Sequence, residues 1–193
     1  MLGLGSAIYM SKLPGLKLLG TYTSDFSSNT DGWSALSVEG DLELTANATV
    51  AGSDGWLKGE FDENQTDSLS GIEKNSPLGA TSMIGDYWSI SYKIYLSSSN
   101  WTHESGETDD VNHIFKYVHV GSSDYTTDFF GANNAAAKGQ AVSYDFNVAT
   151  AQTSTTPLDL LQFYFTNTTT KDDVPQAGAI FYLKDIVLKA YRS

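Results

Sequence analysis

The sequence contains no cysteine and few basic residues, and both shortages narrow its possible functions. Without cysteine the chain has no disulfide framework, no thiolate nucleophile and no cysteine-ligated zinc site. Its 11 Lys and Arg residues are outnumbered by 23 Asp and Glu residues, which gives a formal net charge of −12. Because affinity for nucleic-acid phosphates comes mainly from Lys and Arg, this balance argues against a nucleic-acid-binding protein.

Long hydrophobic runs are also missing. The opening MLGLGSAIYMSKLPGLKLLG is apolar, but Lys12, Pro14 and Lys17 interrupt it, and no positively charged segment precedes it. We therefore expect neither a signal peptide nor a membrane span. An apolar opening on an acidic chain favours a docking arm over residues 1–20 that binds a partner surface. Its contact residues would be Leu2, Leu4, Ile8, Tyr9, Leu13 and Leu16.

The second half of this opening has an alternative interpretation. In it, Leu16, Leu18 and Leu19 form the first core strand instead of docking on another chain.

The rest of the chain alternates apolar and polar residues in short runs, which predicts β-strands. In the run DYWSISYKIYL, alternate residues would form one face that points into the core: Trp88, Ile90, Tyr92, Ile94 and Leu96. Similar runs are DLELTANATVA, NHIFKYVHVGS, AVSYDFNVA, LLQFYFTN and AIFYLKDIVLKAY, whereas only GANNAAAKGQA favours a short helix. About eight to ten such strands predict an all-β protein, an antiparallel sandwich of the jelly-roll type over residues 21–193.

Two stretches carry resemblances to known families. The start DFSSNTDGW with SVEGDLELTA, and the final FYLKDIVLKA, resemble the first and last strands of jelly-roll carbohydrate-binding modules of the galactose-binding-like kind. The opening MLGLGS is similar to the start of small lectin-like virion proteins of tailed, marine-type bacteriophages. Together these resemblances imply a phage structural protein with a virion-binding arm and a sandwich domain.

Aromatic residues supply the candidate glycan-binding surface, because sugars stack their apolar faces on aromatic rings. Trp101 lies in the polar stretch SSSNWTHESGETDD, where strand packing gives it no evident role, and His103 follows it. Tyr87, Tyr95, Tyr117 and His119 would line neighbouring strand faces. The alternative interpretation of these faces is a subunit interface, because Tyr and Trp are enriched in protein interfaces, and for a self-assembling particle it is the favoured one.

Structural calcium is implied by the resemblance to the carbohydrate-binding modules. Asp185 in LKDIVL matches the acid of the family's closing strand. The family's second acid has no direct match, because Ser27 stands at its position, and Asp25 is the candidate replacement.

Catalysis finds little support in the sequence. No GxSxG or HExxH motif is present, and the acids show no marked pair of the kind a glycosidase needs. We predict a non-catalytic virion component, assembled in the host cytoplasm, present in several copies and bound to capsid or tail subunits, with its sandwich facing host polysaccharide. The alternative is a free carbohydrate-binding module or a non-catalytic fragment of a glycan-active enzyme.

Overall fold

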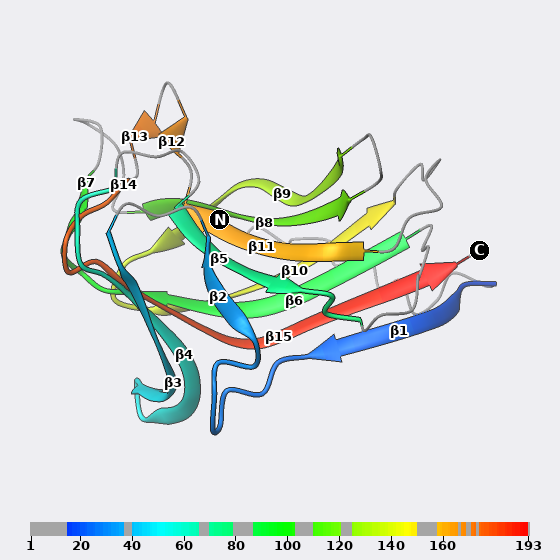
Figure 1. Ribbon diagram of the computed structural model, residues 1–193, viewed down its shortest axis with the longest axis horizontal. Helices are drawn as coiled ribbons and strands as arrows, with labels where there is room; N and C mark the ends of the chain where they lie inside the picture. The colour runs from blue at the N-terminus through cyan, green and yellow to red at the C-terminus, as the bar shows by residue number, and fades with distance from the viewer. Residues whose placement is uncertain are drawn as a thin grey trace, which may run out of the picture.

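The computed structural model is a two-layered, antiparallel β-sandwich (Figure 1). It describes residues 15–36, 40–65, 70–78, 87–102, 110–120, 125–149, 158–165, 167–168, 171–172 and 174–192. The strands are β1 (Lys17–Thr23), β2 (Trp33–Leu36), β3 (Leu42–Val50), β4 (Ser53–Phe61), β5 (Ser70–Asn75), β6 (Tyr87–Leu96), β7 (Trp101–Thr102), β8 (Asp110–Val120), β9 (Tyr125–Ala137), β10 (Ala141–Ala149), β11 (Leu158–Phe165), β12 (Asn167–Thr168), β13 (Lys171–Asp172), β14 (Val174–Pro175) and β15 (Ile180–Arg192).

The larger layer, here called sheet A, has six strands in the order β10-β6-β15-β4-β3, with β1 also paired to β15. β15 pairs with β6 on one side, and on the other it pairs first with β4 through Ile180–Leu183 and then with β1 through Val187–Arg192. The register shifts between these two parts, where Asp185 adopts a left-handed φ of 53°. A β-bulge therefore marks the point where β15 exchanges one neighbour for another.

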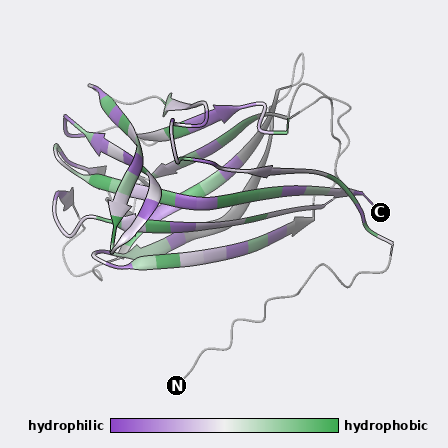
Figure 2. Ribbon diagram, turned by 90° about the horizontal axis from the view of Figure 1, so that it is seen from below, coloured by the Kyte–Doolittle hydropathy of each residue, from purple (hydrophilic) through white to green (hydrophobic). Residues whose placement is uncertain are grey.

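The second layer, sheet B, has five strands in the order β2-β5-β11-β8-β9, and two short pairs, β12 with β13 and β14 with β7, lie outside both sheets. Its central strand β11 pairs antiparallel with β5 and β8. Hydrophobic and hydrophilic residues alternate along many of the strands (Figure 2), as expected for sheets that each cover the other with one face. No helix in the described ranges has the length and hydropathy to cross a bilayer.

The core between the sheets is aromatic, and the inward set predicted for the run DYWSISYKIYL is confirmed. All five of its residues, Trp88, Ile90, Tyr92, Ile94 and Leu96, are at most 2% exposed. β11 contributes Leu161, Phe163 and Phe165 from the opposite layer, and the rings of Phe163 and Phe181 lie 5.6 Å apart across the sandwich. The all-β jelly-roll prediction is thus confirmed.

Two local predictions differ from the structure. The stretch GANNAAAKGQA, predicted to favour a short helix, contributes its first seven residues to β9, which pairs with β8. Sheet pairing overrides the helix preference of the alanines there. In addition, β1 begins at Lys17, inside the predicted arm of residues 1–20. Leu19 packs against the core, whereas Leu18 is 50% exposed and Leu16 is half-buried.

Candidate functional site

The outer face of sheet B carries two adjacent rows of side chains that point away from the core. Strand alternation directs Leu161, Phe163 and Phe165 of β11 inward, so Gln162 and Tyr164 point outward. The register extends each of them into a row across neighbouring strands. One row is Glu73, Gln162 and Lys116, and the other is Gly71, Tyr164 and Ile114.

These outward side chains are not spread over an open surface. Tyr164 is 5% exposed, and Gln162 and Ile114 are 8% exposed, although none of the three belongs to the core between the sheets. Glu73 and Lys116 at the two ends of the polar row are half-buried. Polar and aromatic groups on the outer face of sheet B are therefore largely shielded from solvent.

Gly71 brings β5 close to β11 beneath this surface. An added Cβ at Gly71 would lie 2.0 Å from the carbonyl oxygen of Phe163 and 2.7 Å from the Cβ of Tyr164. A glycine inside a strand often marks such a close approach of backbone. Gly71 is the residue of β5 that pairs with Tyr164 of β11. Because Gly71 has no side chain, β5 places no side chain beside the ring of Tyr164 at this paired position.

Hydrogen bonding and burial determine the electrostatics of the polar row. Gln162 donates from Nε2 to Oε2 of Glu73 over 3.1 Å, which orients both groups. The Nζ atom of Lys116 lies 5.7 Å from the ring centroid of Tyr164. Burial lowers the pKa of Lys116 and raises the pKa of Tyr164. The row thus presents a carboxylate acceptor, an amide and a cationic donor beside an aromatic ring, a combination suited to sugar hydroxyls and ring faces.

The structure places Trp101 differently from the sequence-based expectation. Trp101 forms β7, is 8% exposed and belongs to the core cluster, with its ring 4.7 Å from that of Phe165. Its Nε1 donates to the hydroxyl of Ser97 over 3.2 Å. The ring therefore packs between the layers, and replacing Trp101 would disturb the fold before it reported on a ligand.

Tyr87 and Tyr95 lie on the outer face of sheet A, on the opposite side of the sandwich from the two rows. Each is half-buried and stands opposite a tyrosine of β15, Tyr191 and Tyr182 respectively. The rings of Tyr95 and Tyr182 meet edge to face at 5.8 Å. Their glycan-binding role stays a prediction, and the two tyrosines do not join Trp101.

Several further predicted residues cannot be compared with the structure. The backbones of Tyr117 and His119 lie in β8, but their side chains lie outside the described part. His103 lies wholly outside the described residues. So do five arm residues: Leu2, Leu4, Ile8, Tyr9 and Leu13.

The two predicted calcium ligands are engaged separately. Oδ1 of Asp25 accepts a hydrogen bond from the Ser27 backbone N–H over 3.0 Å, and hydrogen bonding from the side chain and then the backbone of Ser27 lowers the pKa of Asp25. Asp185 forms an ion pair of 2.7 Å with Lys93. Among the residues that the structure describes, no group of three or more His, Asp or Glu side chains is placed to hold a metal ion. Calcium binding by Asp25 and Asp185 stays a prediction from the resemblance.

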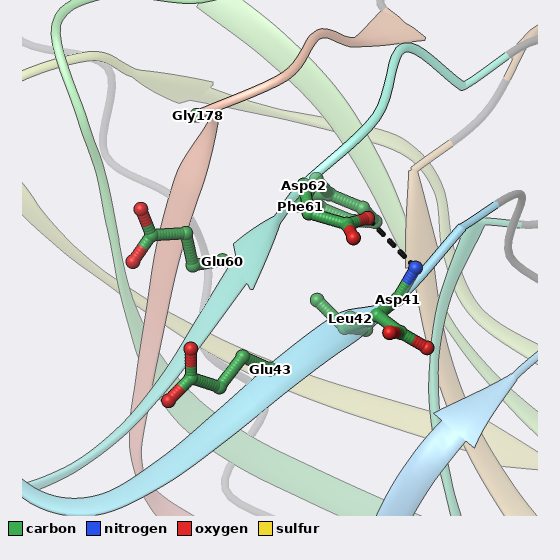
Figure 3. Close-up of a pocket in the computed structure, with 7 residues that line it drawn as sticks. All are labelled: Asp41, Leu42, Glu43, Glu60, Phe61, Asp62 and Gly178. Carbon is green, nitrogen blue, oxygen red and sulfur yellow. Dashed lines mark hydrogen bonds between the residues drawn. The ribbon is translucent and has the colours of Figure 1, made fainter.

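An acidic hollow of about 690 Å³ lies at the edge of sheet A (Figure 3). Four carboxylates line it, and Oδ1 of Asp62 accepts a hydrogen bond of 2.7 Å from the Asp41 backbone N–H. Its one aromatic residue, Phe61, is fully buried and offers no ring face to a sugar. The remaining lining residues are Leu42, Glu43, Glu60 and Gly178. This hollow is therefore a weaker candidate for a glycan site than the outer face of sheet B.

The sequence analysis missed the two rows, although a signal was present. In LLQFYFTN the inward residues were recognised, and the same alternation sends Gln162 and Tyr164 to the other face. Their alignment with Lys116 and Glu73 depends on which strands pair and in which register, and no local pattern reveals this pairing.

Comparisons with known proteins give structural neighbours alone. No protein-family model and no curated protein sequence matches the chain. The CBM22-1 xylan-binding domain of Paenibacillus barcinonensis Xyn10C is 16% identical, with a TM-score of 0.60 over 92% of this chain and 96% of that domain. This chain and that domain share the jelly-roll fold.

Two further neighbours agree with this likeness. The CBM22-2 xylan-binding domain of the same Paenibacillus barcinonensis protein is 16% identical, with a TM-score of 0.59 over 88% of this chain and 98% of that domain. A structure described as a xylan-binding domain from CBM 22 is 14% identical, with a TM-score of 0.56 over 89% and 95% of the two chains. At these identities the likeness establishes the jelly-roll fold.

Proposed function

We propose that this protein is a carbohydrate-binding module that holds a glycan chain on the outer face of sheet B. The observation that carries the proposal is the sheltered ring of Tyr164 beside the row of Glu73, Gln162 and Lys116. A sugar bound over this row would place its hydroxyls next to hydrogen-bonding groups of both polarities. The xylan-binding description of the structural neighbours supports a ligand of this class.

Binding without catalysis is the role that this face supports. A glycosidase needs two carboxyl groups flanking the scissile bond. In the two described rows Glu73 is the sole acid, and its carboxylate is held by Gln162. The rows can orient a sugar, but they offer no second carboxyl group to protonate a leaving group or activate water.

The first test replaces Tyr164 by alanine and measures binding to a panel of soluble polysaccharides by affinity electrophoresis, followed by calorimetry on the best ligand. Loss of a central aromatic contact is expected to weaken binding at least about tenfold. The matched control is Tyr95→Ala, which removes a half-buried strand tyrosine from the outer face of sheet A. Circular dichroism of both variants checks that they fold.

The outcomes of this test separate the alternatives. If Tyr95→Ala abolishes binding and Tyr164→Ala leaves it intact, the glycan lies on sheet A. If the folded wild-type protein binds no member of the panel or of a broad glycan array, the proposal is wrong.

The virion role remains a sequence-based prediction. It rests on the arm, most of which lies outside the described residues, and on the resemblance of MLGLGS to phage proteins. The fold neighbours reported above are carbohydrate-binding modules, so they favour the alternative of a free or enzyme-attached module. Partner subunits, copy number and location in a virion are untested.

A further inference from the structure

Lys116 is a half-buried cation that forms no ion pair with another residue of the described part. The ion pairs there join Lys58 with Glu60, Lys74 with Asp31 and Lys93 with Asp185. The Nζ atom of Lys116 instead lies 5.7 Å from the centroid of the Tyr164 ring. A half-buried lysine usually has an acidic partner, and the described side chains supply none to Lys116.

Glu73 does not neutralise this lysine. The two residues stand at opposite ends of the polar row, with Gln162 between them on the central strand. Two strand spacings separate their backbones by about 10 Å. The carboxylate of Glu73 is instead held by the amide of Gln162. Among the described residues, the row therefore has a lysine without an acidic partner at one end and a hydrogen-bonded carboxylate at the other.

Shelter from water makes an unpaired charge costly, and an anion that binds beside it recovers part of that cost. The same shelter strengthens a charge-assisted hydrogen bond to such an anion. We infer that the glycan bound on the outer face of sheet B carries a negative group, a uronate carboxylate or a sulfate ester, which binds Lys116 beside the ring of Tyr164. This inference rests on the proposed function and names the class of its ligand.

An acidic glycan fits this surface better than a nucleic acid. Double-stranded DNA carries a charge about every 1.7 Å, and proteins that bind it neutralise several phosphates at once. The two described rows hold a single cation, with a carboxylate across the row from it. A glycan with widely spaced negative groups and many hydroxyls matches the one cation, one amide and one carboxylate acceptor of this row.

The test uses pairs of oligosaccharides that differ in one negative group. A glycan array presents uronate-bearing chains beside their carboxyl-reduced forms, and sulfated chains beside their desulfated forms, and calorimetry follows for the best pair. We expect the acidic member to bind at least about tenfold more tightly, as for a charge-assisted hydrogen bond. The preference should shrink as salt is raised. Comparison of the uronate pairs with the sulfate pairs shows which of the two negative groups binds Lys116.

Lys116→Gln is the deciding variant. In this variant the acidic and the neutral member of each pair should bind with the same affinity. The matched control is Lys189→Gln, which removes a half-buried lysine from the outer face of sheet A, also without an ion pair among the described residues, and should leave the preference intact.

The possible failures are distinguishable. Equal binding of both members of every pair, or a preference that survives Lys116→Gln, overturns the inference but leaves the proposed function in place. Binding to nucleic acid in preference to all glycans would overturn both, as would a folded protein that binds no glycan.

Discussion

At the scale of single residues, His113 has the most unusual environment. It lies on β8 with 0% exposure, and its Nε2 is 2.9 Å from the hydroxyl of Tyr92 on β6, so this hydrogen bond links the two sheets. Aromatic rings of Tyr144 and Phe163 lie 5.1 and 5.5 Å from its ring. Burial lowers the pKa of His113 to about 3 and raises that of Tyr92, so both side chains are neutral over the physiological range.

The first stability prediction concerns this histidine. In the unfolded chain its pKa returns to about 6.5, so between pH 6.5 and 3 the unfolded state binds a proton that the folded state does not. The free energy of unfolding should therefore fall as the pH is lowered through this window, by up to about 1.4 kcal/mol per pH unit from this group. Urea unfolding at pH 7, 6, 5 and 4 measures the slope.

The variant His113→Phe supplies the comparison. It should be less stable at pH 7, because the hydroxyl of Tyr92 loses its hydrogen bond to His113 and keeps that from Asn134, yet it should show a shallower loss towards pH 4. Parallel curves for the two proteins would contradict the assignment of this pH dependence to His113.

At the scale of elements, β11 shows how one strand serves two purposes. Its inward residues fill the core and its outward residues form the centre of both rows on sheet B. The close approach of β5 at Gly71 holds the two strands together at Tyr164. Substitutions at this contact should therefore affect stability and ligand binding together.

Gly71→Ala tests this contact. The added methyl group would meet the backbone of β11 at 2.0 Å, which requires a strand shift, and overpacking of this kind costs about 1–3 kcal/mol. Gly139→Ala is the control, because its Cβ meets nothing within 4 Å and the cost comes from its φ of 74° alone, about 1 kcal/mol. Chemical denaturation compares the two. A smaller loss for Gly71→Ala than for Gly139→Ala would show that the strands separate easily.

The elements that the sequence predicted best are those with strong alternation. β3, β6, β8, β10, β11 and β15 coincide with predicted runs, because period-two patterning encodes a half-buried strand directly. β9 was missed because its alanines carry no strand signal, and Trp101 was misplaced because the short β7 lies inside a polar stretch. The register that creates the two rows comes from pairing between distant segments, which a linear pattern does not contain.

At the scale of the whole molecule, the N-terminal segment joins the sandwich earlier than predicted. Lys17–Gly20 pair with the end of β15, and Leu19 packs on the core. The alternative in which Leu16, Leu18 and Leu19 form a first core strand is right in part, since β1 contains two of the three and Leu18 is half-exposed.

Two truncations measure this contribution. A protein lacking residues 1–16 keeps β1, whereas one lacking residues 1–20 loses four of its seven residues. The free energy of unfolding of the protein lacking residues 1–20 should be about 2 kcal/mol lower than that of the protein lacking residues 1–16. This is the scale of burying one leucine side chain. Thermal and urea unfolding of the two truncated proteins give the difference. Equal stability would mean that Lys17–Gly20 contribute nothing to the stability of the sandwich.

β15 is the centre of sheet A, yet it is the last strand in sequence order. A nascent chain on the ribosome thus has β1, β4 and β6 available long before the strand that joins them has left the exit tunnel. Until then their backbone edges stay open to other chains, and these long-range pairings form slowly. Chaperone dependence during synthesis, and aggregation of products that stop before Ile180, follow from this order of strands.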